Sequence, residues 1–177
     1  MTIAFNHKLS QLTTLLIIIL LLLINACGFH LRGSVDFNFS SIQIQSEAAD
    51  RVAQEVERIL HAEGVQIAAS TKQAQAVLFL RNEKTDKRVL TVSSISGKLE
   101  ENELNFRVSM EVRQPDDTVL LPEQVISLLR DYSFDDQAVL AMAAEEDVLR
   151  EEMFRDVVAQ IIRRLQVIKV IRPVKDK

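Results

Sequence analysis

The sequence has few of the residues that build disulfides, metal centres and phosphate-binding loops. Its 177 residues include one cysteine, three histidines and four glycines. A single cysteine can form neither an internal disulfide nor a cysteine-based metal site, and so few glycines leave no phosphate-binding loop. The histidines are His7, His30 and His61, and none has a catalytic partner nearby in the sequence. We therefore predict that the protein is not an enzyme and holds neither cofactor nor metal.

Basic residues are not in excess either. The chain has 21 Lys and Arg against 25 Asp and Glu. Residues 1–26 contain Lys8 and no acid, so the remainder has 20 basic and 25 acidic side chains and a formal charge of −5. Binding to nucleic acid by counterion release needs a basic surface, so this balance argues against a nucleic-acid partner. The remaining length, about 150 residues, suits one domain.

The apolar residues are concentrated at the amino terminus. Seventeen of the first 26 residues are apolar, and ten of them run without interruption from Leu15 to Ile24. This run is about half of the roughly 20 residues that a membrane-spanning helix needs. A weakly cationic start followed by a short apolar run is typical of a secretory signal peptide. We predict that residues 1–26 are such a peptide and are removed.

The residues that end this segment point to lipidation. Ile24 lies three residues before Cys27, the small Ala26 lies directly before it, and Gly28 follows. This order resembles a bacterial lipobox, in which the thiol is alkylated by diacylglycerol and the new amino terminus is acylated. The alternative is that Cys27 is only a small apolar residue at the end of a hydrophobic segment. Three acyl chains would anchor the protein permanently. Gly28, rather than Asp, follows the cysteine, and by resemblance to the bacterial sorting rule this favours the outer membrane.

Alternating apolar residues predict the strands of one domain, residues 41–170, between a lipidated tether of residues 27–40 and a short tail of residues 171–177. The clearest alternation spans residues 104–113, with Leu104, Phe106 and Val108 on one side. A charged stretch, 81–88, separates two of the apolar runs and is either a solvated turn or a polar strand end. Strands are predicted at 42–45, 104–113 and 125–134, with one or two more from the apolar runs at 76–80 and 88–94. Turns are predicted at 97–98 and 114–117.

Two segments have helical spacing. The first runs from Ser46, a candidate cap, to Glu63, and Gly64 can close it. The second begins at Asp135 or Asp136 and runs to about Lys169, with a broad apolar stripe. The order of elements predicts an α+β fold in which both helices pack on one face of a mainly antiparallel, four-stranded sheet. The other face of the sheet is expected to be polar.

Basic residues on the predicted sheet are candidates for binding an anionic ligand, because guanidinium and ammonium groups pair well with phosphate and carboxylate oxygens. Lys98 lies at a predicted hairpin tip, where its side chain can reach a large ligand. The alternative for Arg107 and Arg113 is pairing across strands with neighbouring acids. Arg130 interrupts an apolar face, which is more typical of a bulge or a boundary residue.

Four segments together resemble the LptE family of lipopolysaccharide-assembly lipoproteins. The most specific is the cysteine block. The second most specific, an acidic and aromatic run, leads into the long helix and is followed by Leu140 and Ala141. The segments follow one another over essentially the whole mature chain: Cys27–Gly33 (CGFHLRG), Ser96–Leu104 (SGKLEENEL), Arg130–Asp136 (RDYSFDD) and Gln160–Leu165 (QIIRRL).

The resemblance implies an outer-membrane lipoprotein, anchored on the periplasmic side, that sits as a plug inside the LptD β-barrel. Such a protein helps to assemble the barrel and to pass lipopolysaccharide outward. The family fold, two helices on a four-stranded sheet, agrees with the order of elements above. The alternative is a structural outer-membrane lipoprotein that scaffolds another envelope machine without binding lipopolysaccharide.

Two positions depart from the family pattern as it bears on lipopolysaccharide. An aromatic residue is common where Asn102 stands, and a basic residue can occur near Met142. Lys98, followed by Arg107, is therefore the candidate for contacting lipopolysaccharide phosphates. The negative charge of the mature chain means that such contact must depend on local basic residues.

Overall fold

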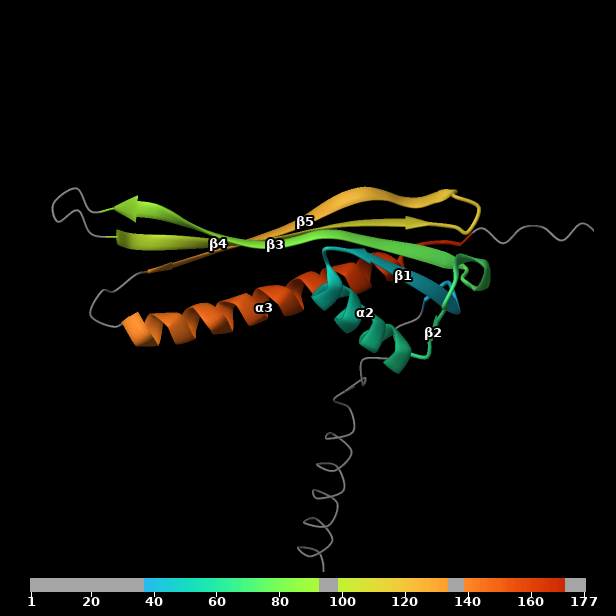
Figure 1. The fold of residues 1–177 in the computed structure, drawn as a ribbon, viewed down its shortest axis with the longest axis horizontal. Coiled ribbons are helices and arrows are strands. Elements are labelled where there is room, and N and C mark those ends of the chain that lie inside the picture. Colours follow the sequence, from blue (N-terminus) through green and yellow to red (C-terminus); the bar gives the residue numbers. More distant parts are fainter. Residues whose placement is uncertain (1–36, 93–98, 134–138, 171–177) are drawn as a thin grey trace, which may run out of the picture. The chain divides into compact units, whose positions relative to one another are not determined.

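The structure, a computed structural model, describes residues 37–92, 99–133 and 139–170. Within these residues the chain forms two α-helices and five strands (Figure 1). In chain order they are β1 (Ser41–Glu47), α2 (Asp50–Ala62), β2 (Gln66–Ile67), a 3₁₀ turn (Thr71–Gln73), β3 (Ala76–Val92), β4 (Leu99–Arg113), β5 (Val119–Ser133) and α3 (Val139–Gln166).

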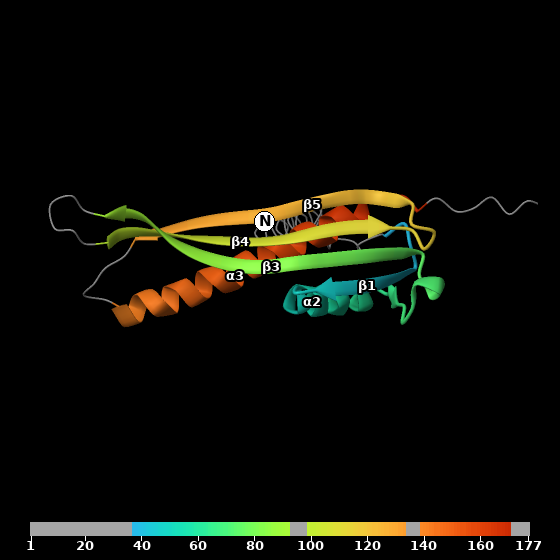
Figure 2. The ribbon, with the colours of Figure 1, turned by 45° about the horizontal axis from the view of Figure 1, so that its top comes forward.

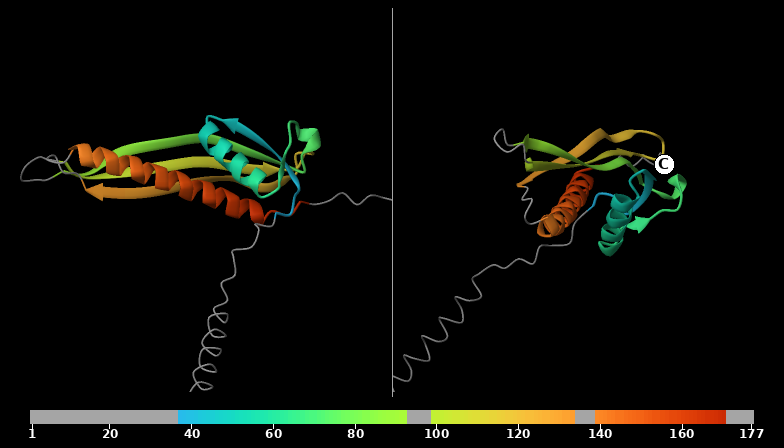
Figure 3. Two further views of the ribbon diagram at one scale, coloured as in Figure 1. Left: turned by 90° about the horizontal axis from the view of Figure 1, so that it is seen from below. Right: turned by 60° about the vertical axis from the view of Figure 1, so that its left-hand side comes forward.

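The strands form one mixed sheet in the order β2-β1-β3-β4-β5. Figure 2 shows β1, β3, β4 and β5 side by side. The predicted α+β class is confirmed, and both helices cover the same face of the sheet (Figure 3). The sheet has five strands rather than four because of the two-residue β2, which pairs with β1 in parallel. β1 also pairs with β3 in parallel, because α2 returns the chain to the end of the sheet where β1 starts. The pairs β3-β4 and β4-β5 are antiparallel, as predicted.

The alternation of β4 sorts its side chains between the two faces of the sheet. On the face that the helices cover, every apolar side chain from Leu104 to Val112 is buried. The predicted stripe of α3 packs on the same core, from Met153 to Leu165, and the rings of Phe106 and Phe154 meet at 6.4 Å between centroids. Each such side chain contributes about 1.5 to 3 kcal/mol on burial. We call the opposite face of the sheet, which neither helix covers, the outer face.

The charged stretch 81–88 is not a turn, because β3 is one strand of 17 residues that includes both apolar runs. The charged stretch between the two apolar runs stays extended, with one register shift between Arg81 and Lys84. β4 runs beside it and pairs with its main-chain groups, so a turn would leave these hydrogen bonds unmade. The charged side chains of this stretch of β3 then alternate between the outer face and the face that the helices cover.

The amino terminus of α2 differs from the sequence prediction. Ser46 is not its cap, because β1 continues to Glu47 and the helix begins only at Asp50. The carboxylate of Glu83, from β3, takes the role of a cap by accepting a hydrogen bond from the main-chain N–H of Val52 at 3.1 Å. The prediction for the other end is confirmed, since Gly64 follows the helix with φ +83°, a conformation that glycine adopts without strain.

Several boundaries also shift. β5 begins at Val119 rather than Val125, and α3 ends at Gln166 rather than near Lys169. The second predicted turn is confirmed by a hydrogen bond from the N–H of Gln114 to the carbonyl of Thr118, 2.8 Å long. The predicted turn at 97–98 and the caps at 135 and 136 lie outside the described residues.

One buried side chain breaks the apolar pattern under the sheet. Asn102 is fully buried, opposite Val89 on one neighbouring strand and Tyr132 on the other. Neither its amide nitrogen nor its amide oxygen has a hydrogen-bond partner. Burying an unpaired amide costs roughly 1 to 3 kcal/mol. The domain therefore carries a local cost at this position that an apolar residue would not incur.

We predict that Asn102→Leu raises the free energy of unfolding by about 1 kcal/mol, because it removes an unpaired polar group without emptying the site. Urea denaturation followed by circular dichroism measures the change. Asn105→Leu is the control, since the side chain of Asn105 accepts a hydrogen bond from Ser127 and should not stabilise the protein when replaced. A destabilised Asn102→Leu variant would contradict the prediction.

Candidate interaction surfaces

Arg107 lies on the outer face, where it forms a small cluster with two residues of β3. Its Nη2 atom is 2.7 Å from Oδ2 of Asp86, and Nζ of Lys84 is 2.8 Å from Oδ1 of the same carboxylate. The cross-strand ion pair that was the alternative for Arg107 therefore forms. The hydrogen bond from Lys84 and the nearby charge of Arg107 hold the pKa of Asp86 below its usual value. One carboxylate shared by two cations leaves this outer-face cluster (Lys84, Asp86, Arg107) with a net positive charge.

A depression of about 370 Å³ lies beside the outer-face cluster. Lys84, Arg107, Ser109 and Val125 contribute to its lining, together with Asn82, whose backbone is left-handed with φ +56°. Its volume is within the range of small-molecule sites, but such sites usually enclose most of their ligand. We regard this depression as a place for one group of a larger ligand.

The other cations of the outer face are also paired. Arg113 lies 2.7 Å from Glu111 on its own strand, and Arg81 reaches the same carboxylate from β3 at 3.2 Å. Both arginines, Arg113 above all, lower the pKa of Glu111 through hydrogen bonds. Arg88 pairs with Glu103 at 2.5 Å. The outer face is therefore densely charged while most of its described charges are matched locally.

The remaining candidates are not brought together with Arg107. Arg130 faces the helix side, and its Nη2 lies 3.1 Å from Oδ2 of Asp156 on α3. It therefore links the sheet to the helix and does not take part in the outer face. Cys27 and Lys98 both lie outside the described residues.

A second cluster, which the sequence analysis did not predict, joins α3 to the sheet on the helix side. The carboxylate of Glu146 lies 2.6 Å from Nζ of Lys87, 2.5 Å from the hydroxyl of Tyr132 and 2.6 Å from Nη2 of Arg150. Burial raises the pKa of Glu146, but hydrogen bonds from Lys87, Tyr132 and Arg150 outweigh it and lower the pKa to about 2. We call these four residues the Glu146 cluster. Only the i, i+4 spacing of Glu146 and Arg150 was a signal for it in the sequence.

The described residues offer no sign of a metal site or a membrane-spanning helix. Within 37–92, 99–133 and 139–170, no three histidine, cysteine or acidic side chains group closely enough to hold a metal ion. Neither described α-helix combines the length and apolar character needed to cross a membrane.

The outer face also carries exposed apolar side chains on β5, among them Val125 and Leu129. Val125 is 62% exposed and Leu129 is 50% exposed, both on β5 with Ser127 between them. They lie on the same face because they are four residues apart in a strand. Together with the charged pairs, they make the outer face suited to contact with another macromolecule.

Comparison with known proteins gives a family match over most of the chain. Residues 36–165 match the family model described as "LptE: Lipopolysaccharide-assembly". The chain is also 28% identical over 160 residues to the LPS-assembly lipoprotein LptE of Photorhabdus laumondii subsp. laumondii, covering 88% of this chain and 85% of that protein.

Solved structures share the fold. Lipoprotein B from Nitrosomonas europaea superposes with a TM-score of 0.69 at 30% sequence identity, covering 78% of this chain and 90% of that one. Rare lipoprotein B from Shewanella oneidensis gives a TM-score of 0.60 at 22% identity over 70% and 92% of the two chains. At that identity the second likeness shows the fold alone.

The Glu146 cluster leads to a pH-dependent prediction. Because the pKa of Glu146 is lowered, the stability it contributes is present above the usual carboxyl value of 4.5 and is lost as the pH falls towards about 2. We expect Glu146→Gln to lower the free energy of unfolding at pH 7 by about 1 to 3 kcal/mol. The difference from the unchanged protein should shrink steadily below about pH 5.

Urea denaturation at several pH values measures this difference. Glu145→Gln is the matched control, because Glu145 is exposed on the same turn of α3. A destabilisation by Glu146→Gln that is the same at pH 7 and pH 3 would show that the ionised carboxylate is not its source.

Proposed function

From the premise that the chain belongs to the LptE family of lipopolysaccharide-assembly proteins, we propose that it is an outer-membrane lipoprotein that aids lipopolysaccharide transport to the outer leaflet. The observation that carries this proposal is the family match over residues 36–165, which includes every described strand and nearly all of α3. The role is one of binding and assembly, and it needs no catalytic group.

Attachment to the membrane is the first part of the proposal. Residues 1–26 act as a signal peptide and are removed, and Cys27 carries the lipid. Residues 27–40 tether the domain of residues 41–170, and residues 171–177 form its tail. The domain then lies on the periplasmic side of the outer membrane. Support comes from the sequence pattern around Cys27 and from the lipoprotein relatives.

The second part is a partnership with an LptD-like β-barrel, in which the domain acts as plug and assembly partner. The lumen of a wide outer-membrane barrel is polar and holds water. This domain buries its apolar core between the sheet and the helices, and its outer face is charged. Such a domain is compatible with a polar lumen. Locally paired charges, such as Arg113 with Glu111, help because an unpaired charge is costly to remove from water.

The third part is contact with lipopolysaccharide, an anionic glycolipid, at Lys98 and Arg107. The mature chain has a formal charge of −5, so attraction to phosphate must come from local cations. The outer-face cluster supports Arg107, since Lys84 and Arg107 share one carboxylate and keep a net positive charge.

A second candidate function is that of a scaffold for another envelope machine that does not bind lipopolysaccharide. The observation in its favour is that Arg88, Arg107 and Arg113 already pair with acids of this chain. A phosphate would have to compete with those carboxylates.

We expect the full-length protein to recover a large β-barrel when it is captured from detergent-solubilised outer membranes. The comparison is Cys27→Ala, which should no longer incorporate a labelled fatty acid, because without the thiol there is no site for the acyl chains. Recovery of the lipoprotein without a large barrel would contradict the proposed partnership. Fatty-acid labelling of the Cys27→Ala variant would contradict the anchor.

We also expect Lys98→Asp to weaken lipopolysaccharide binding by the purified full-length protein roughly tenfold, since it removes one charge-assisted hydrogen bond and adds a like charge. Arg107→Gln should have a smaller effect in the same direction, because Arg107 is already paired. Lys169→Asp makes the same charge change at a described residue that is exposed, and it should leave binding unchanged. Equal losses in Lys98→Asp and Lys169→Asp would indicate a general charge effect, and no lipopolysaccharide binding at all would favour the scaffold.

A further inference from the structure

The sheet has two long open edges. β1 pairs with β3 as far as Arg81, and the N–H of Glu83 still donates to the carbonyl of Ala48. Among the described residues, no strand pairs with this side of β3 from Lys84 onward. β5 is the last strand of the sheet and, in the part of the chain that the structure describes, pairs only with β4 (Figure 2). The main-chain N–H and C=O groups of an open edge are unpaired and can form hydrogen bonds with a strand of another chain. Proteins usually protect such edges.

The open edge of β3 is protected and much of β5 is not. β3 has a register shift after Arg81 and then carries Lys84, Lys87 and Arg88, and shifts and charged side chains are common edge protection. The first part of β5 has Pro122 beside another register shift. From Val125 to Ser133, β5 pairs with β4 in unbroken register and contains no proline. Its two charged residues, Arg130 and Asp131, lie in its second half, and Arg130 is turned to the helix side, where it pairs with Asp156. We call this segment, Val125–Ser133, the bare edge.

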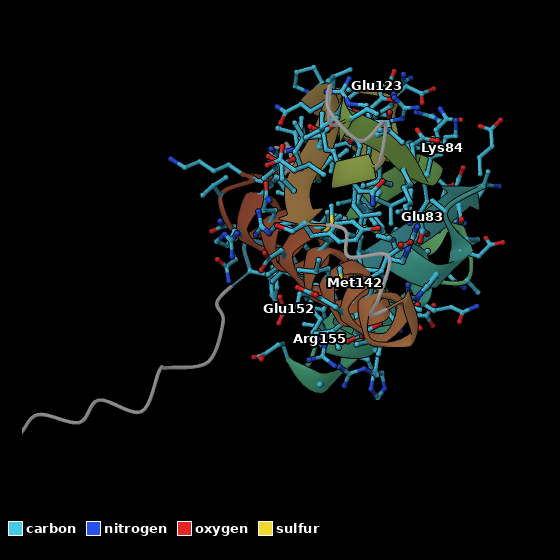
Figure 4. All side chains as sticks on the ribbon, turned by 90° about the vertical axis from the view of Figure 1, so that its left-hand side faces the viewer. Glu83, Lys84, Glu123, Met142, Glu152 and Arg155 are labelled. Carbon is cyan, nitrogen blue, oxygen red and sulfur yellow. The ribbon has the colours of Figure 1, made fainter. Side chains whose placement is uncertain are left out.

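The side chains along the bare edge follow a symmetric pattern on the outer face. Val125, Ser127 and Leu129 alternate there, and the exposed Asp131 follows in the same register. The exposed Glu123 lies two residues before Val125, at the register shift. Figure 4 shows Glu123 on the sheet side of the domain, away from Glu152 and Arg155 on the helix side. Among the described residues, neither Glu123 nor Asp131 forms an ion pair. Apolar exposure and two unmatched charges therefore coincide with the open main chain.

We propose that the bare edge accepts an extended strand from another polypeptide. On the outer face of the sheet, every second side chain of that strand is, in order, basic, apolar, small, apolar and basic. Main-chain hydrogen bonds along β5 would supply affinity, and alternate side chains would supply specificity. The apolar residues cover Val125 and Leu129, and the basic residues meet Glu123 and Asp131. This inference goes beyond the proposed function and does not depend on it.

The charges argue against a second copy of this chain as the occupant. An antiparallel pair of bare edges centred on Ser127 matches Val125 with Leu129, but it also places Glu123 opposite Asp131 at both ends. Parallel pairing in register places each acid opposite itself. Like charges directly opposite one another destabilise a strand pair. The strand must also come from a segment outside any closed barrel, because barrel strands have no free edge.

The test uses the full-length protein in detergent and a fluorescent peptide of sequence K-T-V-T-S-T-I-T-K. The peptide has the required alternation in either strand direction. We expect saturable binding and slower amide hydrogen exchange within residues 125–133, with no change within residues 84–92. A peptide with glutamate in place of both lysines should bind at least tenfold more weakly.

Two sets of variants locate the site. Val125→Lys combined with Leu129→Lys should weaken binding at least tenfold, since it places positive charges against the peptide. Val148→Lys is the matched control, because Val148 is 57% exposed on α3, and it should bind normally. Glu123→Lys combined with Asp131→Lys should reverse the preference, so that the glutamate peptide binds better than the lysine peptide. A reversed preference requires a folded protein, which guards against misfolding as the cause of a loss.

Three outcomes would overturn the proposal. The first is no saturable binding of the lysine peptide. The second is binding that leaves hydrogen exchange in residues 125–133 unchanged or that survives the lysine substitutions at Val125 and Leu129. The third is protection of residues 125–133 from amide hydrogen exchange in the absence of peptide, if this protection becomes stronger at higher protein concentration. Such protection would identify a second copy of the chain as the occupant.

Discussion

The fold depends on covering one apolar face of three unusually long strands. β4 and β5 each have 15 residues, so they extend about 50 Å at about 3.3 Å per residue. α3 has 28 residues and, at about 1.5 Å per residue, reaches about 42 Å. A single helix can therefore cover most of the sheet lengthwise, while α2 covers the part next to β1. Because both helices are used on one face, the outer face remains available for contact with other molecules.

Features with a local signal were predictable from the sequence. The alternation of β4 and the stripe of α3 identify their buried faces, because each pattern repeats within the element itself. The continuity of β3 was not predictable, since its charged stretch stays extended only because β4 lies beside it. The start of α2 was missed for the same kind of reason: its capping carboxylate belongs to Glu83, on another strand.

The candidate sites divide in the same way. The residues around Cys27 form a linear pattern, and strand parity alone predicts that Arg107 faces outward. Its partner Asp86 could not be assigned, because the register of β3 with β4 contains a shift. The Glu146 cluster consists of residues from β3, β5 and α3. Only the contact between Glu146 and Arg150, both on α3, could be predicted from the spacing of residues in the sequence. Open edges are equally invisible before the strand order is known.

The two ends of α3 are held to the sheet by different forces. From Met153 to Leu165 the helix contributes fully or nearly fully buried apolar side chains. Towards its amino terminus it contributes only partly buried ones, Met142 and Leu149, and its firmest contacts are those of Glu146. Asn102 adds an unpaired amide under the same strands. Because segments with few buried apolar contacts open at lower free energy, this part of α3 should separate from the sheet before the rest unfolds.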